Sequence, residues 1–309
     1  MAVAETEFAW HNGQFIKWAD AKVHALSHVV NYGSSVFEGI RCYATPRGPA
    51  IFRLHEHIRR LFDSAKIYRM VIPFTMENIE RACAASVARA GLSTCYVRPA
   101  VMRGYGTVGV DPTGAPIDVF IFAYPWGPYL GENALADGVD VGTSSWARPA
   151  PNTHPTMAKA GGNYLNSQLM KMEARANGYV EAIALDTDGR LSEGSGENLF
   201  LVRDGRLWTT PLASSILPGI TRDTVMTIAR ELGLAVTETS ILREAVYIAD
   251  ELFFCGTAVE VTPIRSVDRQ PIGTGKPGPI TKKIQDAYLS LVQGKTKDER
   301  GWLYPVAAD

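Results

Sequence analysis

Apolar residues recur at helical spacing in four stretches of the chain. In the most regular stretch, Leu54, Ile58, Leu61 and Ala65 share one helix face, which predicts a helix over about residues 54–68. Capping residues and glycines bound the other stretches, as expected at helix ends. The three further helices are expected over about 165–177, with an apolar stripe of Leu165, Leu169 and Met172; from the N-cap Thr221 to Gly233; and over about 280–292.

Three glycine-containing turns lie beside strand-like runs of apolar and aromatic residues. They are Asn12-Gly13, Asp188-Gly189 and Asp204-Gly205. Asn or Asp before Gly supplies the positive φ angles that tight hairpin turns require, so each turn predicts a β-hairpin. Because hairpins join antiparallel strands, the pattern indicates an α+β fold and argues against a purely parallel sheet.

Proline and glycine are concentrated just after residue 124, where Pro125, Gly127 and Pro128 interrupt any regular element. We therefore predict three parts of the chain: an N-terminal α+β domain over 1–124, an interdomain linker over 125–136 and a C-terminal domain over 137–309. Ligands often bind where domains meet, so the division also predicts where a site would be built.

The 309 residues include 31 Lys+Arg and 32 Asp+Glu, which gives a formal net charge of −1. This balance argues against a nucleic-acid-binding protein, because phosphate contacts usually require a basic surplus. The first residues lack the basic and apolar regions of a signal peptide, and no stretch has the roughly 18 to 20 apolar residues of a membrane-spanning helix. The four cysteines form no CxxC pair, which is typical of reduced thiols. We expect a soluble, cytoplasmic protein.

Two motifs resemble cofactor or metal sites but lack the context that such sites need. Residues 104–109 match GxGxxG, yet residues 110–116 are rich in Pro and Gly and cannot open the helix of a dinucleotide-binding unit. His24 and His28 lie four positions apart, but no third ligand at zinc-site spacing accompanies them. We expect an irregular loop at the first motif and no bound metal at the second.

Lys159 is the first candidate for chemistry, because it lies between Ala158 and Ala160-Gly161-Gly162, just ahead of a predicted helix. Small neighbours leave volume around the amine and allow a flat ligand to approach closely. Burial there would favour the neutral, nucleophilic amine that a Schiff-base lysine needs. On this segment alone, a solvated loop lysine remains the alternative. Lys171 lies about 120° from the apolar stripe of its predicted helix, where a solvated lysine is expected.

Two later segments contain further residues of interest. Glu193 and Glu197 lie among glycines directly ahead of an apolar run, and Gly219, Ile220 and Thr221 stand at the start of a predicted helix. The free N–H groups and partial positive charge of a helix N-terminus suit a phosphate. An ordinary capped helix is the alternative there.

Six stretches of the sequence together point to one family. They are Tyr32–Arg41, Asp63–Arg69, Lys159–Tyr164, Glu193–Phe200, Leu217–Arg222 and Gly256–Pro263. In these stretches the chain resembles the class IV aminotransferases, which use pyridoxal 5′-phosphate (PLP) and adopt fold type IV. Within that class it is similar to the branched-chain amino acid aminotransferases, and the likeness extends over residues 8–303.

The resemblance implies both a fold and an activity. The fold would be a two-domain α+β structure, with a smaller N-terminal α/β sandwich-like domain and a larger C-terminal pseudo-barrel domain that binds PLP. The activity would be reversible transamination of L-leucine, L-isoleucine and L-valine with 2-oxoglutarate, which gives branched-chain 2-oxo acids and L-glutamate by a PLP/PMP ping-pong mechanism.

The resemblance also implies which residues hold PLP. Lys159 would be catalytic, since it would bind PLP as a Schiff base and then shuttle a proton. Glu193 would pair with the pyridine nitrogen and keep it protonated, and Tyr164 would hydrogen-bond the phenolic oxygen of the ring. The other cofactor residues implied are Arg60, Gly196, Leu217, Gly219, Ile220, Thr221 and Thr257.

For the substrate, the resemblance implies an apolar pocket for the branched side chain and a polar side for the carboxylate. Arg98 would take the distal carboxylate of glutamate. Tyr32 and Val110 would come from the neighbouring subunit, so we expect at least a homodimer, with a hexamer (a trimer of dimers) as the larger alternative. The substrate residues implied are Tyr32, Phe37, Gly39, Arg41, Tyr96, Arg98, Val110, Trp126, Tyr129, Tyr164, Thr257 and Ala258.

Three alternatives stay open at this point: a D-amino acid or (R)-amine transaminase on the same fold, a PLP lyase of that fold, and a PLP-free binding protein. The pair Tyr96 and Arg98 together with Phe37–Arg41 favours the L-specific branched-chain type. Residues 103–107 depart from the pattern of the family, which leaves the preferred amino acid open.

Overall fold

The computed structural model describes residues 3–306, and the chain divides into two compact units. The first unit contains the residues up to Gly127, the short segment Ala158–Gly162 and the residues from Leu291 onward, and the second contains Pro128–Met157 and Asn163–Ser290. Each unit combines helices with one sheet, so the predicted α+β class is confirmed. Lys159 belongs to the first unit, although it follows the predicted linker in sequence.

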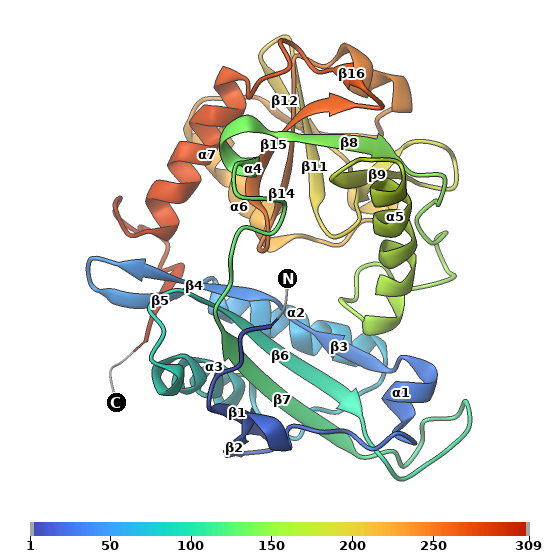
Figure 1. The fold of residues 1–309 in the computed structure, drawn as a ribbon, viewed down its shortest axis with the longest axis vertical. Coiled ribbons are helices and arrows are strands. Elements are labelled where there is room, and N and C mark those ends of the chain that lie inside the picture. The colour runs from blue at the N-terminus through green and yellow to red at the C-terminus, as the bar shows by residue number, and fades with distance from the viewer. Residues whose placement is uncertain (1–2, 307–309) are drawn as a thin grey trace. The chain divides into compact units, whose positions relative to one another are not determined.

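An eight-stranded sheet forms the first unit, and its strands pair antiparallel throughout (Figure 1). The order along the sheet is β17-β5-β4-β6-β7-β1-β2, and β3 pairs with β6 off this path. The strands are β1 (Phe8–His11), β2 (Gln14–Lys17), β3 (Ser35–Phe37), β4 (Ile40–Thr45), β5 (Gly48–Phe52), β6 (Cys95–Arg103), β7 (Ile117–Tyr124) and β17 (Leu303–Pro305).

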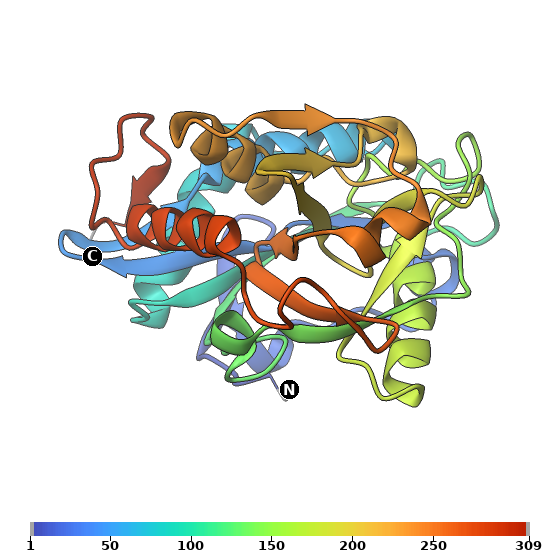
Figure 2. The ribbon, with the colours of Figure 1, turned by 90° about the horizontal axis from the view of Figure 1, so that it is seen from above.

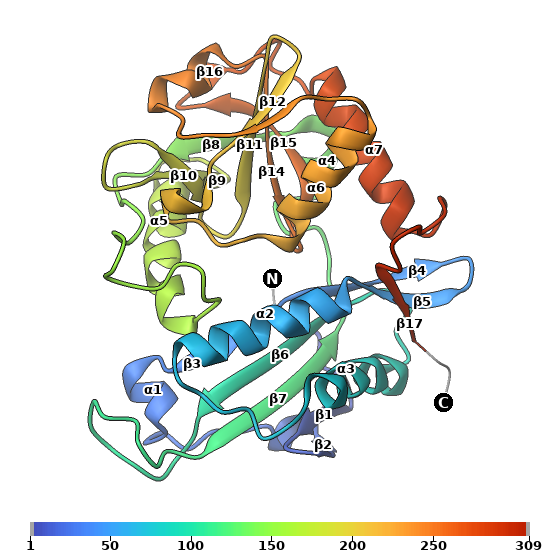
Figure 3. The same cartoon turned by 180° about the vertical axis from the view of Figure 1, so that it is seen from behind.

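Two long helices, α2 (Leu54–Ile67) and α3 (Met76–Ala90), pack on one face of this sheet (Figure 3). The apolar face predicted for α2 is buried as expected. Helix α3 was not predicted from the sequence, although its ends carry helix signals. Thr75 and Asn78 form a capping box, and Gly91 ends the helix in the left-handed conformation. A short helix, α1 (His28–Tyr32), completes the unit.

The second unit contains a nine-stranded mixed sheet that curls into a half-barrel (Figure 2). Its order is β10-β9-β8-β15-β14-β11-β12-β13, with β16 paired to β15; β8 runs parallel to β9 and β15, and β12 parallel to β13. The strands are β8 (Val139–Thr143), β9 (Glu181–Leu185), β10 (Leu191–Gly194), β11 (Asn198–Arg203), β12 (Arg206–Thr209), β13 (Val236–Glu238), β14 (Glu251–Gly256), β15 (Glu260–Val267) and β16 (Gln270–Pro271).

Apart from a four-residue helix that the sequence did not predict, the helices of this unit lie where they are expected, but one exposes a different face. They are α4 (Ala134–Asp137), α5 (Tyr164–Ala176), α6 (Ile220–Glu231) and α7 (Pro279–Val292). On α5 the expected apolar stripe is wrong, because Leu165, Leu169 and Met172 are all exposed. The buried face contains Met170 and Ala174, which pack with alanines of β9. Small side chains let this helix approach the sheet closely, so apolar spacing alone misassigned its face.

The local turn predictions are confirmed. All three Gly-containing turns close antiparallel hairpins, and Asn12 and Asp204 adopt positive φ angles before their glycines. The GxGxxG stretch lies in an irregular loop between β6 and β7, as expected. None of the helices within residues 3–306 combines the length and apolar character needed to cross a bilayer.

Candidate active site

Lys159 is held by its backbone on both sides within the first unit. Its N–H donates to the hydroxyl of Ser64 on α2 at 3.0 Å, and its carbonyl accepts from the N–H of Phe37 at 3.0 Å. Ala160 forms a β-bridge with Val36, so the segment runs beside β3. The amine lies 5.2 Å from the centroid of the Phe37 ring. The base of the lysine is therefore fixed, while its amine projects beside an aromatic ring.

Gly161 allows its segment to pack closely against β3. A Cβ built on Gly161 would lie 2.4 Å from the side-chain hydroxyl oxygen of Ser35, so a larger residue would force the Ser35 side chain to move. From the sequence, the two glycines were explained by open space for a flat ligand. In the structure, Gly161 is explained by its close contact with the Ser35 side chain.

A buried carboxylate, that of Glu38, organises the polar side of the first unit. It accepts two hydrogen bonds from Arg60, at 2.6 and 2.9 Å, and one from Nδ1 of His57 at 2.7 Å. Burial alone would raise the pKa of Glu38, but Arg60 and His57 outweigh burial and hold the pKa well below its usual range. Burial lowers the pKa of His57, so the ring is neutral and donates from Nδ1. Arg60 is therefore oriented by a bidentate ion pair.

The spacing along α2 explains this arrangement. His57, Arg60 and Ser64 follow one another at intervals of three and four residues, so they share one helix face. That face presents two partners to Glu38 and one to the Lys159 backbone. The sequence analysis assigned Arg60 but missed Glu38 and His57. A charged residue between Phe37 and Gly39-Ile40 was the signal that could have marked Glu38.

Aromatic side chains predicted for the substrate pocket come together in this unit. Tyr96 stacks on Trp126 with ring centroids 4.4 Å apart, and the Arg98 guanidinium lies 4.7 Å from the Phe37 centroid and 5.3 Å from that of Tyr96. A Cβ on Gly39 would lie 1.8 Å from the Tyr96 hydroxyl, so only glycine fits beside this ring. These residues form a wall that combines several aromatic rings with one guanidinium cation.

Arg41 lies on the strand next to Tyr96 in the same sheet. It pairs in register with Tyr96 across β4 and β6, and its guanidinium lies 5.7 Å from the Tyr43 centroid.

Tyr32 and Val110, the residues predicted to serve a neighbouring subunit, are both exposed; Tyr32 ends α1, and Val110 lies in the loop between β6 and β7. The N–H of Gly109 donates to the Tyr32 hydroxyl at 3.0 Å. His28 lies buried between them, bonded to the Gly109 carbonyl and to Ser34. The described structure therefore holds the two exposed side chains, 46% and 86% accessible, on one surface of the first unit.

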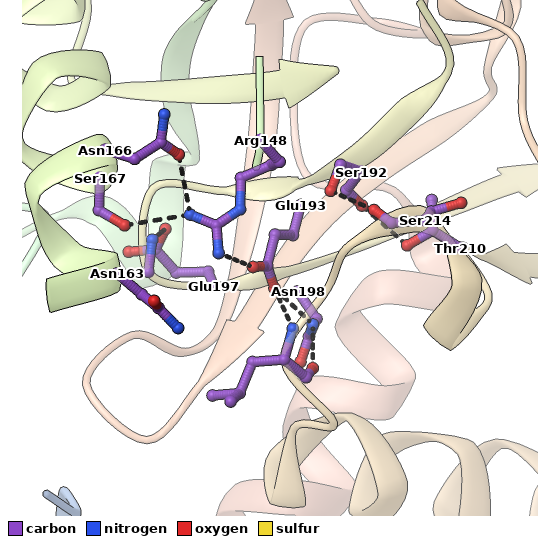
Figure 4. A network of polar contacts seen from close by, with 12 residues as sticks. Arg148, Asn163, Asn166, Ser167, Ser192, Glu193, Glu197, Asn198, Thr210 and Ser214 are labelled. Atoms are coloured by element: carbon purple, nitrogen blue, oxygen red, sulfur yellow. Dashed lines mark hydrogen bonds and ion pairs between the residues drawn. The ribbon is translucent and has the colours of Figure 1, made fainter. Parts of the chain in front are cut away.

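In the second unit, Glu193 is buried and bonded on both oxygens (Figure 4). Oε1 lies 2.9 Å from a guanidinium nitrogen of Arg148, and Oε2 accepts hydrogen bonds from the Asn198 side chain and the Leu217 N–H, each at 3.1 Å. A cation and two N–H donors favour the charged carboxylate. Arg148 was missed by the sequence analysis, because it lies far from Glu193 in the chain.

Arg148 is itself positioned by α5. It donates to the side chains of Asn166 at 3.2 Å and Ser167 at 3.3 Å, and the start of α5 carries Tyr164, which is half-buried. The helix therefore connects a predicted ring contact with the arginine that fixes Glu193. Asn166 takes part in this network through its side-chain oxygen.

Lys171 is not solvated, contrary to the prediction. Its amine donates to the carbonyl of Val180 at 2.8 Å and to the carboxylate of Glu181 at 2.6 Å, and Glu181 is fully buried. The amine also lies 5.4 Å from the ring of the exposed Tyr129. The prediction failed because the strand that follows α5 brings an acid under the helix.

The N-terminus of α6 has no side-chain cap. Thr221 was predicted as the N-cap, but the cap is Gly219 and Thr221 is the second helical residue. A Cβ on Gly219 would lie 1.9 Å from the side-chain amide oxygen of Asn198, so a larger residue would displace the side chain that bonds Glu193. The first N–H groups of an α-helix have no partner within the helix, so those of Ile220 and Thr221 suit an anion.

The remaining predicted residues lie at turns of the second sheet. Gly196 is exposed in the turn between β10 and β11, and Thr257 and Ala258 are half-buried between β14 and β15. The first unit therefore carries Tyr32, Phe37, Gly39, Arg41, Arg60, Tyr96, Arg98, Val110, Trp126 and Lys159, and the second carries Tyr129, Tyr164, Glu193, Gly196, Leu217, Gly219, Ile220, Thr221, Thr257 and Ala258.

These groups fit the PLP that the sequence resemblance implies. Lys159 offers an amine for the aldehyde, and Glu193 offers a buried carboxylate for a protonated pyridine nitrogen. The uncapped start of α6 offers N–H groups for the phosphate. Within the described residues, no group of three or more His, Cys, Asp or Glu is placed to hold a metal ion.

Comparisons with known proteins agree with this chemistry. A family model for amino-transferase class IV matches residues 35–267. A branched-chain-amino-acid aminotransferase from Salmonella typhimurium is 52% identical over 307 residues, which cover 99% of both chains. The structure of the Escherichia coli branched-chain amino acid aminotransferase matches with a TM-score of 0.97 and 51% identity, covering 98% of this chain and 100% of the other. A T.th. branched-chain amino acid aminotransferase with pyridoxamine 5′-phosphate matches with a TM-score of 0.95 and 47% identity, covering 98% of this chain and 99% of the other.

Proposed function

Because the chain belongs to the amino-transferase class IV family, we propose that it transfers the amino group of L-leucine, L-isoleucine and L-valine reversibly to 2-oxoglutarate. PLP is the cofactor, and the products are branched-chain 2-oxo acids and L-glutamate. The observation that carries the proposal is the buried Glu193 carboxylate held by Arg148. A charged acid in the protein interior is costly, and a protonated pyridine nitrogen is a ligand that would use it.

When bound, PLP supplies an electron-withdrawing ring that stabilises negative charge at the substrate Cα. Glu193 would keep the pyridine nitrogen protonated, and Tyr164 would donate a hydrogen bond to the phenolic oxygen. Lys159 would hold the cofactor covalently through its amine between turnovers. During turnover the freed Lys159 amine would carry the proton between the substrate Cα and C4′ of the cofactor.

The phosphate would be bound by Arg60 together with the N–H groups of Ile220 and Thr221 and the hydroxyls of Thr221 and Thr257. Arg60 is pre-oriented by Glu38, so little side-chain entropy is lost when an anion binds. An arginine with helix-end amides suits a dianion. The backbone of Gly196, Leu217 and Gly219 would complete the cofactor contacts.

The substrate contacts would divide by chemistry. Phe37, Trp126, Tyr129 and Tyr164 would surround the branched side chain, with Gly39 and Arg41 beside them. Tyr96, Arg98 and the amides of Thr257 and Ala258 would bind carboxylate. Arg98 lies against two aromatic rings, so one site can present both an apolar surface to leucine and a cation to the distal carboxylate of glutamate. This double character is what a ping-pong exchange of the two substrates requires.

The proposal includes a homodimer in the cytoplasm, in which Tyr32 and Val110 complete the site of the partner; a hexamer built as a trimer of dimers is its larger form. Mixing Tyr32→Ala chains with Lys159→Ala chains tests the shared site. Neither variant alone should be active, whereas mixed dimers should regain activity, because one of their two sites then lacks both changes. Mixtures that stay inactive although mixed dimers form would contradict the shared site.

The activity is tested by incubating purified protein with L-leucine and 2-oxoglutarate and measuring L-glutamate. Formation of glutamate from L-leucine, L-isoleucine and L-valine is expected. If D-alanine reacts in their place, the chain is a D-amino acid transaminase of the same fold. Reduction with borohydride and peptide mapping should place the phosphopyridoxyl group on Lys159, and a label on any other lysine would overturn the mechanism.

Lys159→Ala should abolish turnover. The matched control is Lys66→Ala, since Lys66 is an exposed lysine of the same unit. Lys171→Ala is unsuitable as a control, because Lys171 pairs with a buried acid.

A further inference from the structure

A second acid, Glu197, lies buried in the second unit four residues after Glu193. Its Oε2 accepts one hydrogen bond, from the N–H of Gly196 at 3.0 Å. Glu197 is only 4% exposed, and Gly194 packs so closely that a Cβ built there would lie 2.6 Å from the same oxygen. A buried carboxyl group with a single N–H donor and no cation paired to it is more stable as the neutral acid.

The charges around this group do not balance if every acid is ionised. The three acids Glu181, Glu193 and Glu197 are 0%, 5% and 4% exposed. Lys171 pairs with Glu181 at 2.6 Å, and Arg148 pairs with Glu193 at 2.9 Å. Within residues 3–306, Glu197 makes no ion pair. Two cations therefore serve three buried acids, and one retained proton makes the cluster neutral.

The groups that face Glu197 come from four elements of the unit. Burial raises its pKa most, Glu181 on β9 and Glu193 on β10 raise it further, and Lys171 on α5 lowers it. Cys255 on β14 also faces it, as a neutral thiol whose own pKa is raised by burial. Together these contributions raise the pKa of Glu197 to about 8.

We propose that Glu197 is a positioning residue that keeps its proton at neutral pH and so leaves Glu193 as the one charged carboxylate facing the pyridine nitrogen. Two acids in neighbouring but different surroundings thus take different charge states. If Glu197 were ionised as well, its negative charge would change how strongly the pyridine nitrogen of PLP holds its proton. The assignment of Glu193 to that nitrogen rests on the proposed function, whereas the proton on Glu197 is a property of the folded chain.

Infrared difference spectra with carbon-13-labelled glutamate carboxyls test the proton directly on the protein as isolated. Wild-type protein should lose one buried carboxylic acid band between pH 7 and 10, with a midpoint at about pH 8. Glu197→Gln should lack this band. Glu173→Gln is the matched control: hydrogen bonds from Ser144 and Ser145 outweigh its burial and lower the pKa of Glu173, so the band should remain. A spectrum without the band, or a band that survives in Glu197→Gln, would overturn the proposal.

The link to Glu193 is tested by the absorbance of bound PLP as a function of pH. A step near pH 8 is expected in wild-type protein and in Glu173→Gln and should be missing in Glu197→Gln. If the infrared band were present but the absorbance of PLP showed no such step, the proposed link between Glu197 and Glu193 would be wrong. If the protein bound no PLP, the proposed function would fail while the infrared result still decided the state of Glu197. Should Glu197→Gln not fold, Glu197→Asp must shift the midpoint, and an unchanged midpoint would contradict the assignment.

Discussion

The two units each bury an acid to which the sequence analysis gave no role, and the two acids differ in their partners. Glu38 in the first unit is bonded by Arg60 and His57, and its pKa lies well below the usual range. Glu197 in the second unit accepts one backbone N–H, and its pKa is raised to about 8. Both are nearly inaccessible to water. Similar burial thus leads to opposite charge states, because the partners decide whether the charge is stabilised.

The comparison also explains what each acid contributes. The ionised Glu38 orients a cation, Arg60, which is then available to an anion. Because Glu197 is neutral, the charges at its neighbour Glu193 are those of the Glu193 carboxylate and of Arg148. In the proposed function, the network around Glu38 would serve the phosphate and the network around Glu193 the pyridine nitrogen, two groups that need different charges.

The largest effect is expected from removing the paired acid. Glu38→Ala leaves the guanidinium of Arg60 and the ring of His57 without their acceptor, so the free energy of unfolding should fall by about 3–5 kcal/mol. Urea denaturation at pH 7 measures the change. Glu77→Ala is the control, because Glu77 forms an exposed pair with Arg81 and should cost less than about 1 kcal/mol. A loss for Glu38→Ala no greater than the control's would contradict the role of the network.

Removing one cation would leave a second buried acid of the second unit, Glu181, without an ion pair. Lys171→Ala removes the cation from the buried Glu181, and we expect a loss of about 3 kcal/mol in the free energy of unfolding. Lys66→Ala removes an exposed lysine and should change stability by less than about 0.5 kcal/mol. If the two variants lost equal stability in urea denaturation, Lys171 would be a solvated lysine, as the sequence predicted.

The dependence of stability on pH should separate the two acids. Because the pKa of Glu197 is raised, the folded chain retains a proton that the unfolded chain loses, so the contribution is complete below about pH 4.5 and is lost as pH rises through about 8. Over that window wild-type protein should lose stability relative to Glu197→Gln by about 1.4 kcal/mol per pH unit. Glu38 has a lowered pKa, so its contribution should be lost instead as pH falls below its usual range. Parallel curves for wild-type protein and Glu197→Gln would contradict the raised pKa.

The smallest expected effect concerns the orientation of Arg60. Glu38→Gln keeps one oxygen for Arg60 but removes the charge, so the affinity for PLP should fall about fivefold, or about 1 kcal/mol. Pyridoxal has no phosphate, so its affinity should be unchanged. Equilibrium dialysis with both compounds measures the difference, and an equal loss for the two would show that Glu38 acts on something other than the phosphate site.

Much of the local structure follows from short stretches of sequence. The apolar spacing of α2 and the turn at Asn12-Gly13 were predicted because each depends on residues within a few positions of one another. The face of α5 was not predicted, since its buried side depends on how closely β9 approaches. Of the candidate site, the neighbours of Lys159 made it a candidate, with a solvated loop lysine as the alternative, and the family resemblance gave it its role.

The sequence by itself determined the family, the main helices and hairpins, and which residue types are present for the chemistry. The tertiary structure alone decided the pairs: Glu38 with Arg60, Glu193 with Arg148, and Lys171 with Glu181. The physical reason is that the charge of a buried acid depends on groups within a few ångströms of it. Folding brings those groups together from distant parts of the chain, so no local pattern records which acid receives a cation and which keeps its proton.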